Sequence, residues 1–591
     1  MKPARAYAAE LVNMVSAGNV TLVEGRGGEP TIKSGGVLLH SRYQPREESA
    51  RLIDSAELDL KRPVAVIGCG LGYHVVELAS RGVAVAVFEP DPSVAGLAVQ
   101  HVLRDSDIPL AVGDIDGFSG SEAFQSFARQ IPQILVHPPT ARVHPEYCAA
   151  AATAIAKAAL GAQRLRIAVV GPMYGGSLPI AGYLDRAFRK LGHVSLLIDN
   201  APAWDLYKHT TESVKSKQAS SQLGNMFSHF LGEWTYGRVI EFAPDICIVM
   251  AQAPVGPKFA LRLSALGVVT AFWYVENWRH LPYWKQIAPY YDCFFHIQPG
   301  EFEQRLADAG CPCQAYVQTA CDPDVHKPSN LSPDDGTEFG CDISFAGAGY
   351  YNRIQMFKGL TDYNFKIWGV DWIARELAPL LCRPGQRFTP DLFAKIASAS
   401  KINLNLHSST VCEGIDPQCD AINPRVFEIA ACGGFQLCDP CIGLDRLFDF
   451  DTELPVYRNL RELRSKIDRF LARPDERKTF AERARARALR DHTYENRARQ
   501  MLDVLIEKYG ARVLRKGIRV QRTVAEMVER AGTDTPLGRY LAGLPQDLLF
   551  TQENINSQLT TATRAITEPE KTFAYLREVR NFTEMLLEYK S

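Results

Sequence analysis

Short, continuously apolar runs alternate with amphipathic stretches over most of the chain. Residues 63–68 (PVAVIG) lead into a glycine turn, a helical stretch (VVELASRG) and a second apolar run (VAVAVFEPD). The same order starts again at residues 166–171 (RIAVVG) and 342–347 (DISFAG). Continuously apolar strands followed by helices are typical of parallel sheets covered on both faces. We therefore predict an α/β chain with three Rossmann-like units.

The intervals between these starts predict the domain organisation. We expect an N-terminal Rossmann-like (methyltransferase-like) domain over 1–150, two further Rossmann-like domains over 164–330 and 339–490, and a crossing helix with a helical tail over 491–591. Residues 327–338 (KPSNLSPDDGTE) are polar and turn-rich, so we expect a linker there.

Local patterns also predict individual helices and strands. We expect an N-terminal amphipathic helix, a hairpin of TLVEG with GVLLHS, later strands at DICIVMAQ, VVTAFWYV, CFFHIQ, FKIWG and INLNLHS, a helix over 477–508, and mostly helix over 511–591 with a break near 533–538.

Composition excludes several classes of protein. The 591 residues carry 66 Lys+Arg against 67 Asp+Glu, and this balance removes the electrostatic footprint of a dedicated nucleic-acid binder. Apolar residues make up 46% and charged residues 23%, as in folded proteins. No apolar run reaches the ~18 residues of a membrane span. Glu10 interrupts the stretch where a signal peptide needs an apolar core. We expect a cytoplasmic protein.

Fourteen cysteines are scattered along the chain. Cys311 and Cys313 form a CxC pair and Cys438 and Cys441 a CxxC pair, but the two pairs lie far apart in the sequence. A four-cysteine zinc site normally combines two paired knuckles at closer spacing. Because free cysteine is often simply a core residue, buried structural thiols are favoured over a metal site. We expect no metal.

The first glycine turn lies between a strand and a helix, with an acid at the end of the next strand. The turn holds Gly68, Gly70 and Gly72, and the acid is Glu89. Glycines let a backbone approach a ligand, and an acid about 20 residues on can accept two ribose hydroxyls. The pattern predicts a nucleotide pocket.

This segment resembles the first motif of adenosylmethionine-dependent methyltransferases, with two departures. Val66 stands where those enzymes carry an acid, and residues 137–140 (HPPT) replace their amino-acceptor motif. Adenosylmethionine is therefore a candidate cofactor that is not favoured. The stretches HSRYQPREE and GLGYH and the strand end HPP are similar to the N-terminal part of bacterial motility accessory factors, which are associated with flagellin sugar modification. A Rossmann-like domain without catalysis remains the alternative.

Four ordered motifs in the second half of the chain carry a second resemblance. They are SFAGAGYYNR, NPRVFEIAACGGFQLCD, ELPVYRNLREL and DHTYENR. Residues 164–505 resemble glycosyltransferases of the CgeB (spore maturation protein) type, which have the GT-B fold. The resemblance implies two facing Rossmann-like domains that move a sugar from a nucleotide-sugar donor, held mainly by the second domain, to a protein or glycan acceptor.

Physical chemistry gives roles to the residues of these motifs. Glu428 lies in the first turn of a predicted helix. It can accept hydrogen bonds from the ribose hydroxyls of the donor, or it can simply complement the helix dipole. Arg425 can neutralise a diphosphate by bidentate contact, or it can be solvated. The other candidate residues are glycines and one arginine in three turns or loops. Gly347, Gly349 and Arg353 belong to the turn that would receive phosphates, Gly433 and Gly434 to a turn close to the sugar, and Gly175 and Gly176 to the acceptor-side loop.

Two carboxylates are candidates for catalysis. Asp420 stands eight residues before Glu428, the spacing of the acid pair in many retaining enzymes of this fold. For an inverting enzyme the base should come from the acceptor side, and Glu276 at a strand end is our candidate, with His280 and His296 behind it. Residues in such positions are more often structural than catalytic, so a structural role is the alternative for each.

The sequence thus predicts a nucleotide-sugar-dependent glycosyltransferase with an N-terminal accessory domain. The rivals are a methyltransferase whose second half binds carbohydrate, and a non-catalytic scaffold of a surface-glycan or flagellar pathway. The arginine-rich run around 483–490 lacks the aromatic residues that a nucleic-acid site needs. The helical tail is a candidate dimerisation element. The sugar, the base, the acceptor and the stereochemical course stay open.

Overall fold

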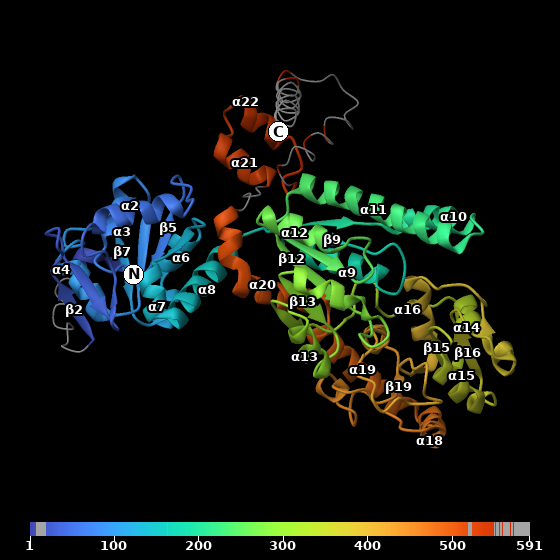
Figure 1. Cartoon of the computed structure of the whole chain (residues 1–591). Helices are drawn as coiled ribbons and strands as arrows, with labels where there is room; N and C mark the ends of the chain where they lie inside the picture. Colours follow the sequence, from blue (N-terminus) through green and yellow to red (C-terminus); the bar gives the residue numbers. More distant parts are fainter. Residues whose placement is uncertain are drawn as a thin grey trace. The chain divides into compact units, whose positions relative to one another are not determined.

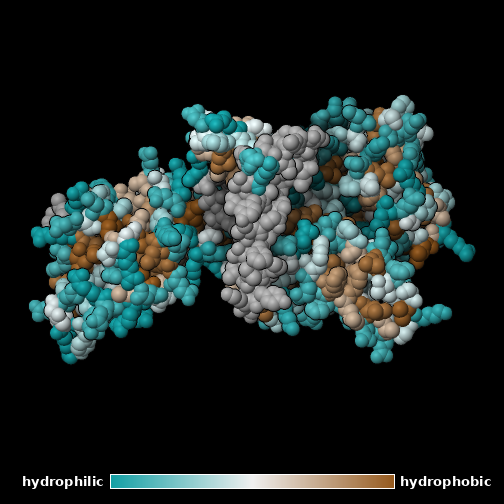
Figure 2. Space-filling view, turned by 90° about the horizontal axis from the view of Figure 1, so that it is seen from above, coloured by the Kyte–Doolittle hydropathy of each residue, from teal (hydrophilic) through white to brown (hydrophobic). Residues whose placement is uncertain are grey.

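The computed structural model describes residues 1–7, 19–161, 163–517, 523–548 and 550, and four single residues beyond these, 555, 558, 568 and 571. Contacts between residues divide the chain into a large unit, Met1–Lys516, and a small one, Gly517–Ser591. Among the described residues no helix is both long enough and apolar enough to cross a membrane. On the face drawn in Figure 2, hydrophilic side chains predominate and apolar ones form small patches.

The first sheet lies in the N-terminal part of the large unit (Figure 1). Its strands run in the order β1-β7-β6-β5-β8, and only β1 is antiparallel to its neighbour. The strands are β1 (Lys2–Pro3), β5 (Val64–Ile67), β6 (Val85–Glu89), β7 (Pro109–Val112) and β8 (Gln133–Val136). The helices are α2 (Pro45–Ser55), α3 (Tyr73–Ser80), α4 (Pro92–Gln100), α5 (Ile115–Ser119), α6 (Glu122–Ala128), α7 (Pro138–Val143) and α8 (Pro145–Gly161).

A small antiparallel sheet precedes this domain and corrects one prediction. Strand β2 (Val20–Val23) pairs with β3 (Thr31–Ser34), and β3 pairs with β4 (Val37–Leu38). The partner of TLVEG is therefore the segment TIKS and not GVLLHS. The sequence reasoning missed β3 because its four residues mix apolar and polar side chains. Most of the predicted N-terminal helix lies outside the described residues.

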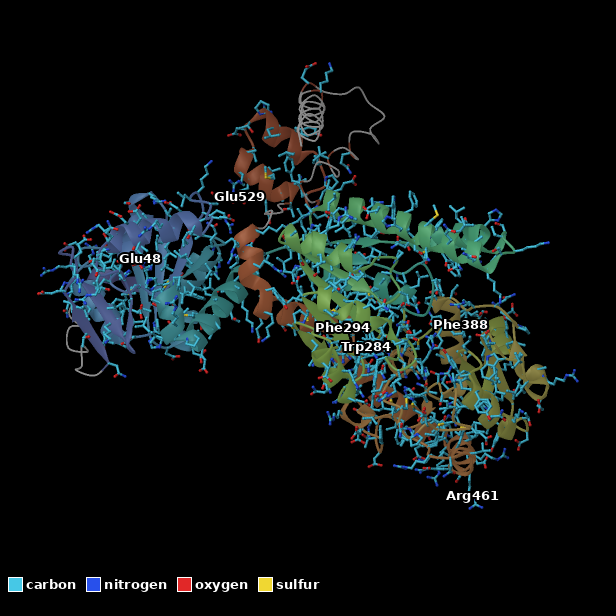
Figure 3. The ribbon with its side chains drawn as sticks, in the orientation of Figure 1. Glu48, Trp284, Phe294, Phe388, Arg461 and Glu529 are labelled. Atoms are coloured by element: carbon cyan, nitrogen blue, oxygen red, sulfur yellow. The ribbon has the colours of Figure 1, made fainter. Side chains whose placement is uncertain are left out.

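The second sheet is entirely parallel, in the order β10-β9-β11-β12-β13-β14. Its strands are β9 (Arg166–Val170), β10 (Val194–Ile198), β11 (Ile246–Met250), β12 (Val269–Tyr274), β13 (Cys293–His296) and β14 (Gln314–Tyr316). The helices are α9 (Leu178–Lys190), α10 (Trp204–Glu212), α11 (Lys217–Phe242), α12 (Pro257–Ala265) and α13 (Glu301–Asp308). Aromatic side chains fill the core between them, including Trp284 and Phe294 (Figure 3).

The third sheet is also parallel, in the order β17-β16-β15-β18-β19. Its strands are β15 (Cys341–Ala346), β16 (Phe365–Trp368), β17 (Leu381–Cys382), β18 (Ser400–Asn405) and β19 (Gln436–Cys438). The helices are α14 (Pro333–Phe339), α15 (Tyr351–Phe357), α16 (Pro390–Ala399), α17 (Arg425–Ala431), α18 (Leu460–Leu471) and α19 (Pro474–Asp491). Helix α14 occupies the second half of the predicted linker, because Ser332 and Asp335 cap its first turn reciprocally.

The chain leaves the third domain through residues 492 and 493 and returns to the second domain in helix α20 (Tyr494–Lys516). The predicted single helix over 477–508 is therefore two helices, α19 and α20. The Cys321 N–H donates to the His492 carbonyl at 2.9 Å, and the Tyr494 N–H donates to the Cys321 carbonyl at 3.0 Å. The motif DHTYENR thus joins the crossing segment to the linker between the two domains.

Helix α20 also contacts the N-terminal domain. A Cβ added at Gly510 would lie 2.7 Å from Ala156 Cβ of α8, so the two helices approach closely at this glycine. Arg62 donates to the Leu514 carbonyl at 2.7 Å, and Lys157 Nζ lies 3.1 Å from Glu507 Oε2. One helix therefore packs against both the first and the second domain.

The small unit contains two described helices, α21 (Val524–Ala531) and α22 (Pro536–Ala542). Val524, Leu541 and Ile555 form its buried cluster. The break predicted near 533–538 falls partly on the turn between these helices. Most of the predicted helical tail after residue 550 lies outside the described residues.

Candidate functional site

Each of the three parallel sheets has a point where strand order reverses. These points lie between β5 and β8, between β9 and β11, and between β15 and β18. Ligands of open α/β sheets bind in the crevice beyond the carboxyl ends of the strands at such a point. The three points can therefore be compared as candidate sites.

The first switch point is filled by side chains of the protein itself. A Cβ added at Gly70 would lie 2.4 Å from His40 Nε2, and one at Gly68 would lie 2.4 Å from Thr140 Oγ1. His40 Nε2 also accepts a hydrogen bond from the Leu71 N–H at 3.0 Å. A Cβ at Gly72 would meet Leu103 at 2.7 Å. The close approach that these glycines permit is thus made by the protein's own side chains.

The acid beyond this turn is engaged as well. The Cys69 N–H donates to Glu89 Oε2 at 2.6 Å and the Asp91 N–H donates to Oε1 at 3.1 Å. Glu89 is buried, and burial raises its pKa to about 7. One carboxylate oxygen holds the backbone of the glycine turn and the other holds the backbone before α4, which differs from the expected ribose contact. Val66 is also fully buried in β5.

The third switch point opens into a cavity of about 700 Å³. Six predicted site residues line it together: Gly175, Gly176, Gly347, Arg353, Arg425 and Glu428. They come from the loop after β9, from β15 and α15, and from the start of α17. The cavity therefore lies between the second and third domains and brings together positions as far apart in the sequence as Gly175 and Glu428.

Arg353 lies in the first turn of α15 and its guanidinium is almost completely buried. Its Nε donates to the Leu406 carbonyl at 2.9 Å and its Nη1 to the Ala348 carbonyl at 2.9 Å. Burial lowers its pKa to about 10, so the side chain stays protonated near pH 7. Arg353 holds the loop after β15 against the end of β18 and places a positive charge in the cavity wall.

Arg425 and Glu428 form an ion pair one turn apart in α17. The Arg425 guanidinium also lies over the rings of Phe388 and Phe393, 5.1 and 4.3 Å from their centroids. Glu428 is 4% exposed, and its Oε1 lies 3.7 Å from His326 Nε2. Burial, with Arg425 and Arg186 nearby, lowers the pKa of His326 to about 3. The carboxylate therefore lies between a cation and a neutral imidazole.

The charges around the cavity suit a diphosphate. Three arginines line it (Arg353, Arg387 and Arg425) against two carboxylates (Asp371 and Glu428). Arginine is well matched to phosphate oxygens because its planar fork donates two parallel hydrogen bonds. Sequence reasoning missed Arg387, Asp371 and His326 because none of them lies in a recognisable motif.

The predicted glycine positions have different surroundings. The N–H groups of Gly347 and Gly349 donate to the Trp368 and Val370 carbonyls, so they are not directed at a phosphate. A Cβ at Gly349 would lie 2.5 Å from the Asp371 carbonyl. Gly433 faces Pro328 and Arg485, and Gly434 faces Asn403. Those last two glycines permit packing of the turn between α17 and β19, which differs from the expected approach to a sugar.

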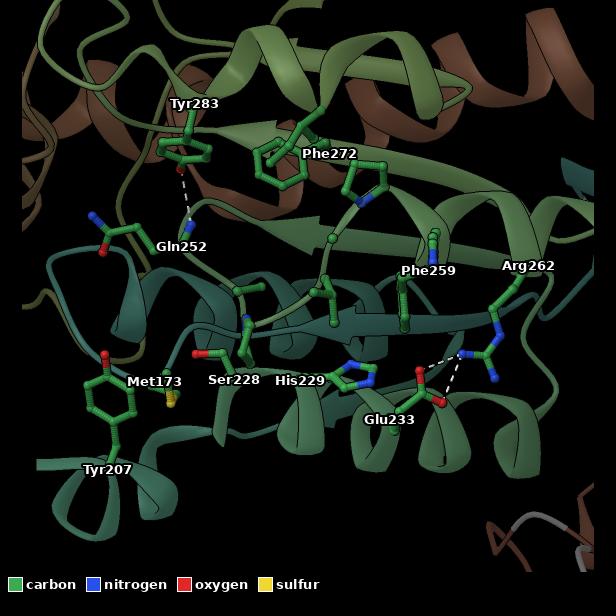
Figure 4. Close-up of a pocket in the computed structure, with 18 of the residues that line it drawn as sticks. Met173, Tyr207, Ser228, His229, Glu233, Gln252, Phe259, Arg262, Phe272 and Tyr283 are labelled. Atoms are coloured by element: carbon green, nitrogen blue, oxygen red, sulfur yellow. Dashed lines mark hydrogen bonds and ion pairs between the residues drawn. The ribbon is translucent and has the colours of Figure 1, made fainter. Parts of the chain in front are cut away.

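The second switch point opens into another cavity, of about 790 Å³ (Figure 4). Aromatic and polar side chains share its wall: Tyr174, Tyr207, Phe259, Phe272 and Tyr283 with His229, Glu233, Gln252 and Arg262. Arg262 pairs with Glu233 at 2.7 Å, and the Gln252 N–H donates to the Tyr283 hydroxyl at 3.1 Å.

The loop after β9 separates the two cavities. Tyr174 lines the second cavity and Gly175 the one at the third switch point. A Cβ at Gly175 would lie 2.5 Å from Gln252 Oε1, and its φ of +104° also favours glycine. Gly175 therefore allows a thin wall between the two spaces.

The two candidate catalytic carboxylates lie outside the described residues that line either cavity. Asp420 is 6% exposed; Arg279 Nη1 donates to both its oxygens at 3.0 and 2.8 Å, and Gln298 Nε2 donates at 2.6 Å. It therefore pairs the third domain with the second. Glu276 follows β12, and burial raises its pKa to about 7.

The two histidines predicted behind Glu276 have different environments. His280 is exposed. His296 is buried, and its Nδ1 and Nε2 contact the Gln298 carbonyl and Gln314 Oε1. Neither ring nitrogen of His296 is available for proton transfer in this arrangement.

Comparisons with known proteins give one family match and several solved structures with similarity. Residues 353–503 match the family model described as glycosyl transferase-like. No curated protein is similar enough to count as a match. Solved structures with similarity include sucrose-phosphate synthase from Thermosynechococcus elongatus (12% identity, TM-score 0.40, covering 57% of this chain and 97% of the other), HepE of Anabaena in complex with UDP and glucose (12%, 0.41, 58% and 99%), and a trehalose-6-phosphate protein of E. coli bound with UDP-2-fluoro glucose (12%, 0.39, 58% and 98%). The chain therefore carries a glycosyl transferase-like region, which extends from α15 through the third domain into α20.

Proposed function

We propose that the protein transfers a sugar from a nucleotide-sugar donor to a protein or glycan acceptor. The observation that carries the proposal is the cavity at the switch point between β15 and β18, where Arg353, Arg425 and Glu428 meet the acceptor-side loop. A nucleotide sugar presents a diphosphate and a ribose diol, which need cations and a carboxylate acceptor close together.

The arrangement supports the chemistry as follows. Arg425 and Arg353 neutralise the diphosphate, which leaves when the bond between the anomeric carbon and its oxygen breaks. Glu428 accepts hydrogen bonds from the ribose hydroxyls while Arg425 lies beside it as an ion-pair partner. A hydroxyl of the acceptor attacks the anomeric carbon, and a base on the acceptor side takes its proton. Glu276, which follows β12 and lines neither cavity, is the proposed base, because a pKa raised to about 7 by burial suits proton transfer at neutral pH.

The second cavity is the proposed acceptor site. Its aromatic rings offer apolar faces to sugar C–H groups, and Gln252, Glu233 and Arg262 offer hydrogen bonds to hydroxyls. The loop after β9 lines both spaces, with Tyr174 in this cavity and Gly175 in the donor cavity. The finer proposals, a CgeB-type enzyme acting in flagellar or cell-surface glycosylation in the cytoplasm, rest on the sequence motifs.

Contacts within the N-terminal domain disfavour the methyltransferase alternative. The glycine turn is filled by His40 and Thr140, and Glu89 holds the backbone with both oxygens. We propose that the N-terminal domain keeps a Rossmann-like fold without methyl transfer. A non-catalytic scaffold predicts that the donor cavity binds no nucleotide.

Calorimetric titration of the full chain separates these functions. The ligands are UDP-, GDP- and ADP-sugars and adenosylmethionine. We expect one nucleotide sugar to bind and adenosylmethionine to give no measurable heat of binding. Glu428→Gln should weaken donor binding about 10-fold or more, because a neutral amide accepts more weakly and one hydrogen bond to a charged group is worth roughly 1.5–3 kcal/mol.

Glu462→Gln is the matched control, because Glu462 is a carboxylate in the first turn of α18 outside the described residues that line the cavity. Its donor affinity should equal that of the unmodified chain. Unchanged affinity in a folded Glu428→Gln variant would remove this carboxylate from the donor site. Binding of adenosylmethionine alone would reject the proposed function in favour of the methyltransferase.

A further inference from the structure

A group of metal-ligand side chains lies where β18 and β19 end side by side. His407 follows β18, Cys438 ends β19, and Asp439 and Cys441 follow β19. Cys419 comes from the loop before α17. One ligand atom each of His407, Cys419 and Cys441 lies within 4.8 Å of the other two. His407 and Cys441 are buried, and Cys419 is largely buried.

The histidine is oriented as a metal ligand would be. Asp439 Oδ1 accepts from the His407 backbone N–H at 2.9 Å and from Nδ1 at 2.8 Å. Since a carboxylate can only accept, Nδ1 carries the proton. Nε2 is buried and has no hydrogen-bond partner among the described residues. Metal-bound histidines typically donate their other ring N–H to a carboxylate in this way.

The two sulfur atoms have a spacing that fits a shared ion. Cys419 Sγ and Cys441 Sγ lie 3.4 Å apart. A disulfide needs about 2.05 Å. Two thiolates on a tetrahedral zinc ion, each at about 2.3 Å, lie ~3.8 Å apart. The observed separation is therefore much closer to the second geometry.

We propose that His407 Nε2, Cys419 Sγ and Cys441 Sγ bind a divalent zinc-class ion, with Asp439 orienting the imidazole. Binding releases two thiol protons, and the two thiolates balance the charge of the ion. Zinc takes four ligands, and a water supplies the fourth. The ion ties the loop before α17 to β19.

The proposed ion constrains a contact between the second and third domains. Cys419 immediately precedes Asp420, which pairs with Arg279 of the second domain. An ion on Cys419 therefore fixes the backbone from which this pair between domains is made. The proposal does not depend on the identity of the donor or on sugar transfer.

A cluster of three histidines in the N-terminal domain does not leave every imidazole lone pair free for an ion. His40, His74 and His137 also lie within ligand distance of one another. However, His40 Nε2 already accepts from the Leu71 N–H, so its lone pair is in use and its other nitrogen carries the proton. That cluster fills the first switch point and needs no ion.

The test uses the full chain purified without a metal-affinity tag from zinc-supplemented medium. Elemental analysis should find about one zinc per chain. Replacement by Co²⁺ should give an intense thiolate-to-cobalt charge-transfer band. Cys419→Ser with Cys441→Ser should lose both the zinc and the band, whereas Cys432→Ala, which removes a buried thiol of the same domain, should keep them.

A gentler variant covers the case in which the double substitution unfolds. Asp439→Asn should keep the fold and weaken zinc binding roughly 10–100-fold, as measured by competition with a chelator. The proposal is overturned if the unmodified chain holds no zinc and gives no cobalt band. It is also overturned if the denatured chain shows two thiols fewer than its 14 cysteines because Cys419 and Cys441 are joined by a disulfide.

Discussion

The ion pair between Arg279 and Asp420 gives a prediction whose size follows from the structure. Arg279 is substituted by Ala, Asp420 by Ala, and both together. Two hydrogen bonds join the pair, and each bond of this kind is worth roughly 1.5–3 kcal/mol when desolvated. The Arg279 side chain is 37% exposed, so solvent screens the attraction and the coupling should be near 1.5 kcal/mol.

Thermal unfolding of the three variants measures that coupling. Each single substitution should lower the melting temperature of the large unit by roughly 1–2 °C, because the shift per kcal/mol falls as the unit grows. The double substitution should lower it little further, because the partner is already lost. Glu301→Ala is the matched control: it removes the exposed partner of the same arginine, 3.4 Å away, and should cost less than about 1 kcal/mol.

The same variants decide whether Asp420 is catalytic or structural. If it acts through Arg279, both single variants lose transferase activity to a similar extent and the double variant is no worse. Strictly additive melting shifts would refute the coupling. An inert Asp420→Ala beside a fully active Arg279→Ala would instead assign the carboxylate to the chemistry.

The remaining predictions concern a titrating acid and two glycine contacts. Glu276 has a pKa raised to about 7 by burial, so a base at this position is protonated and inactive below that pH; the rate of sugar transfer should rise through about pH 7, and Glu276→Gln should remove this rise. A profile unchanged by the substitution would exclude it as the base. Gly510→Leu should separate α8 from α20 and cost roughly 1–3 kcal/mol in thermal unfolding, while Gly237→Leu, with nothing within 4 Å of its Cβ, should cost much less; equal losses would contradict the packing described. Gly70→Ala places a Cβ against His40 at a positive φ of +50°, whereas Gly82→Ala meets a positive φ with nothing within 4 Å. Gly70→Ala should therefore lower the free energy of unfolding by more than Gly82→Ala does. Equal losses in the two variants would show that the first switch point is open.

Local pattern was enough for the parallel α/β framework. Each apolar run followed by a glycine turn became an interior strand of a sheet, as at β5, β9 and β15. The arginine and the glutamate of one short motif, Arg425 and Glu428, then line one cavity. These features depend on neighbours within about 20 residues, which a sequence displays directly.

Features that depend on distant residues were not predictable. His40 lies some 30 residues before the turn that it fills, and Arg279 is 141 residues from Asp420. The cysteine pairs show the same limit. Cys441 was noticed beside Cys438 because of their spacing, whereas its neighbour through space is Cys419 from another loop. Spacing along the chain identifies a metal site only when its ligands belong to one or two local turns.

The double packing of α20 has a consequence for biosynthesis. Helix α8 is complete at residue 161, but its partner surface on α20 ends at residue 516. At roughly 5–20 residues per second, the ribosome needs about 20–70 s to supply the intervening chain. During that time the face of α8 around Ala156 lacks its native contact and is open to chaperones or to other nascent chains. The N-terminal domain is the first to be synthesised, yet it reaches its final packing only after the other two domains have been translated.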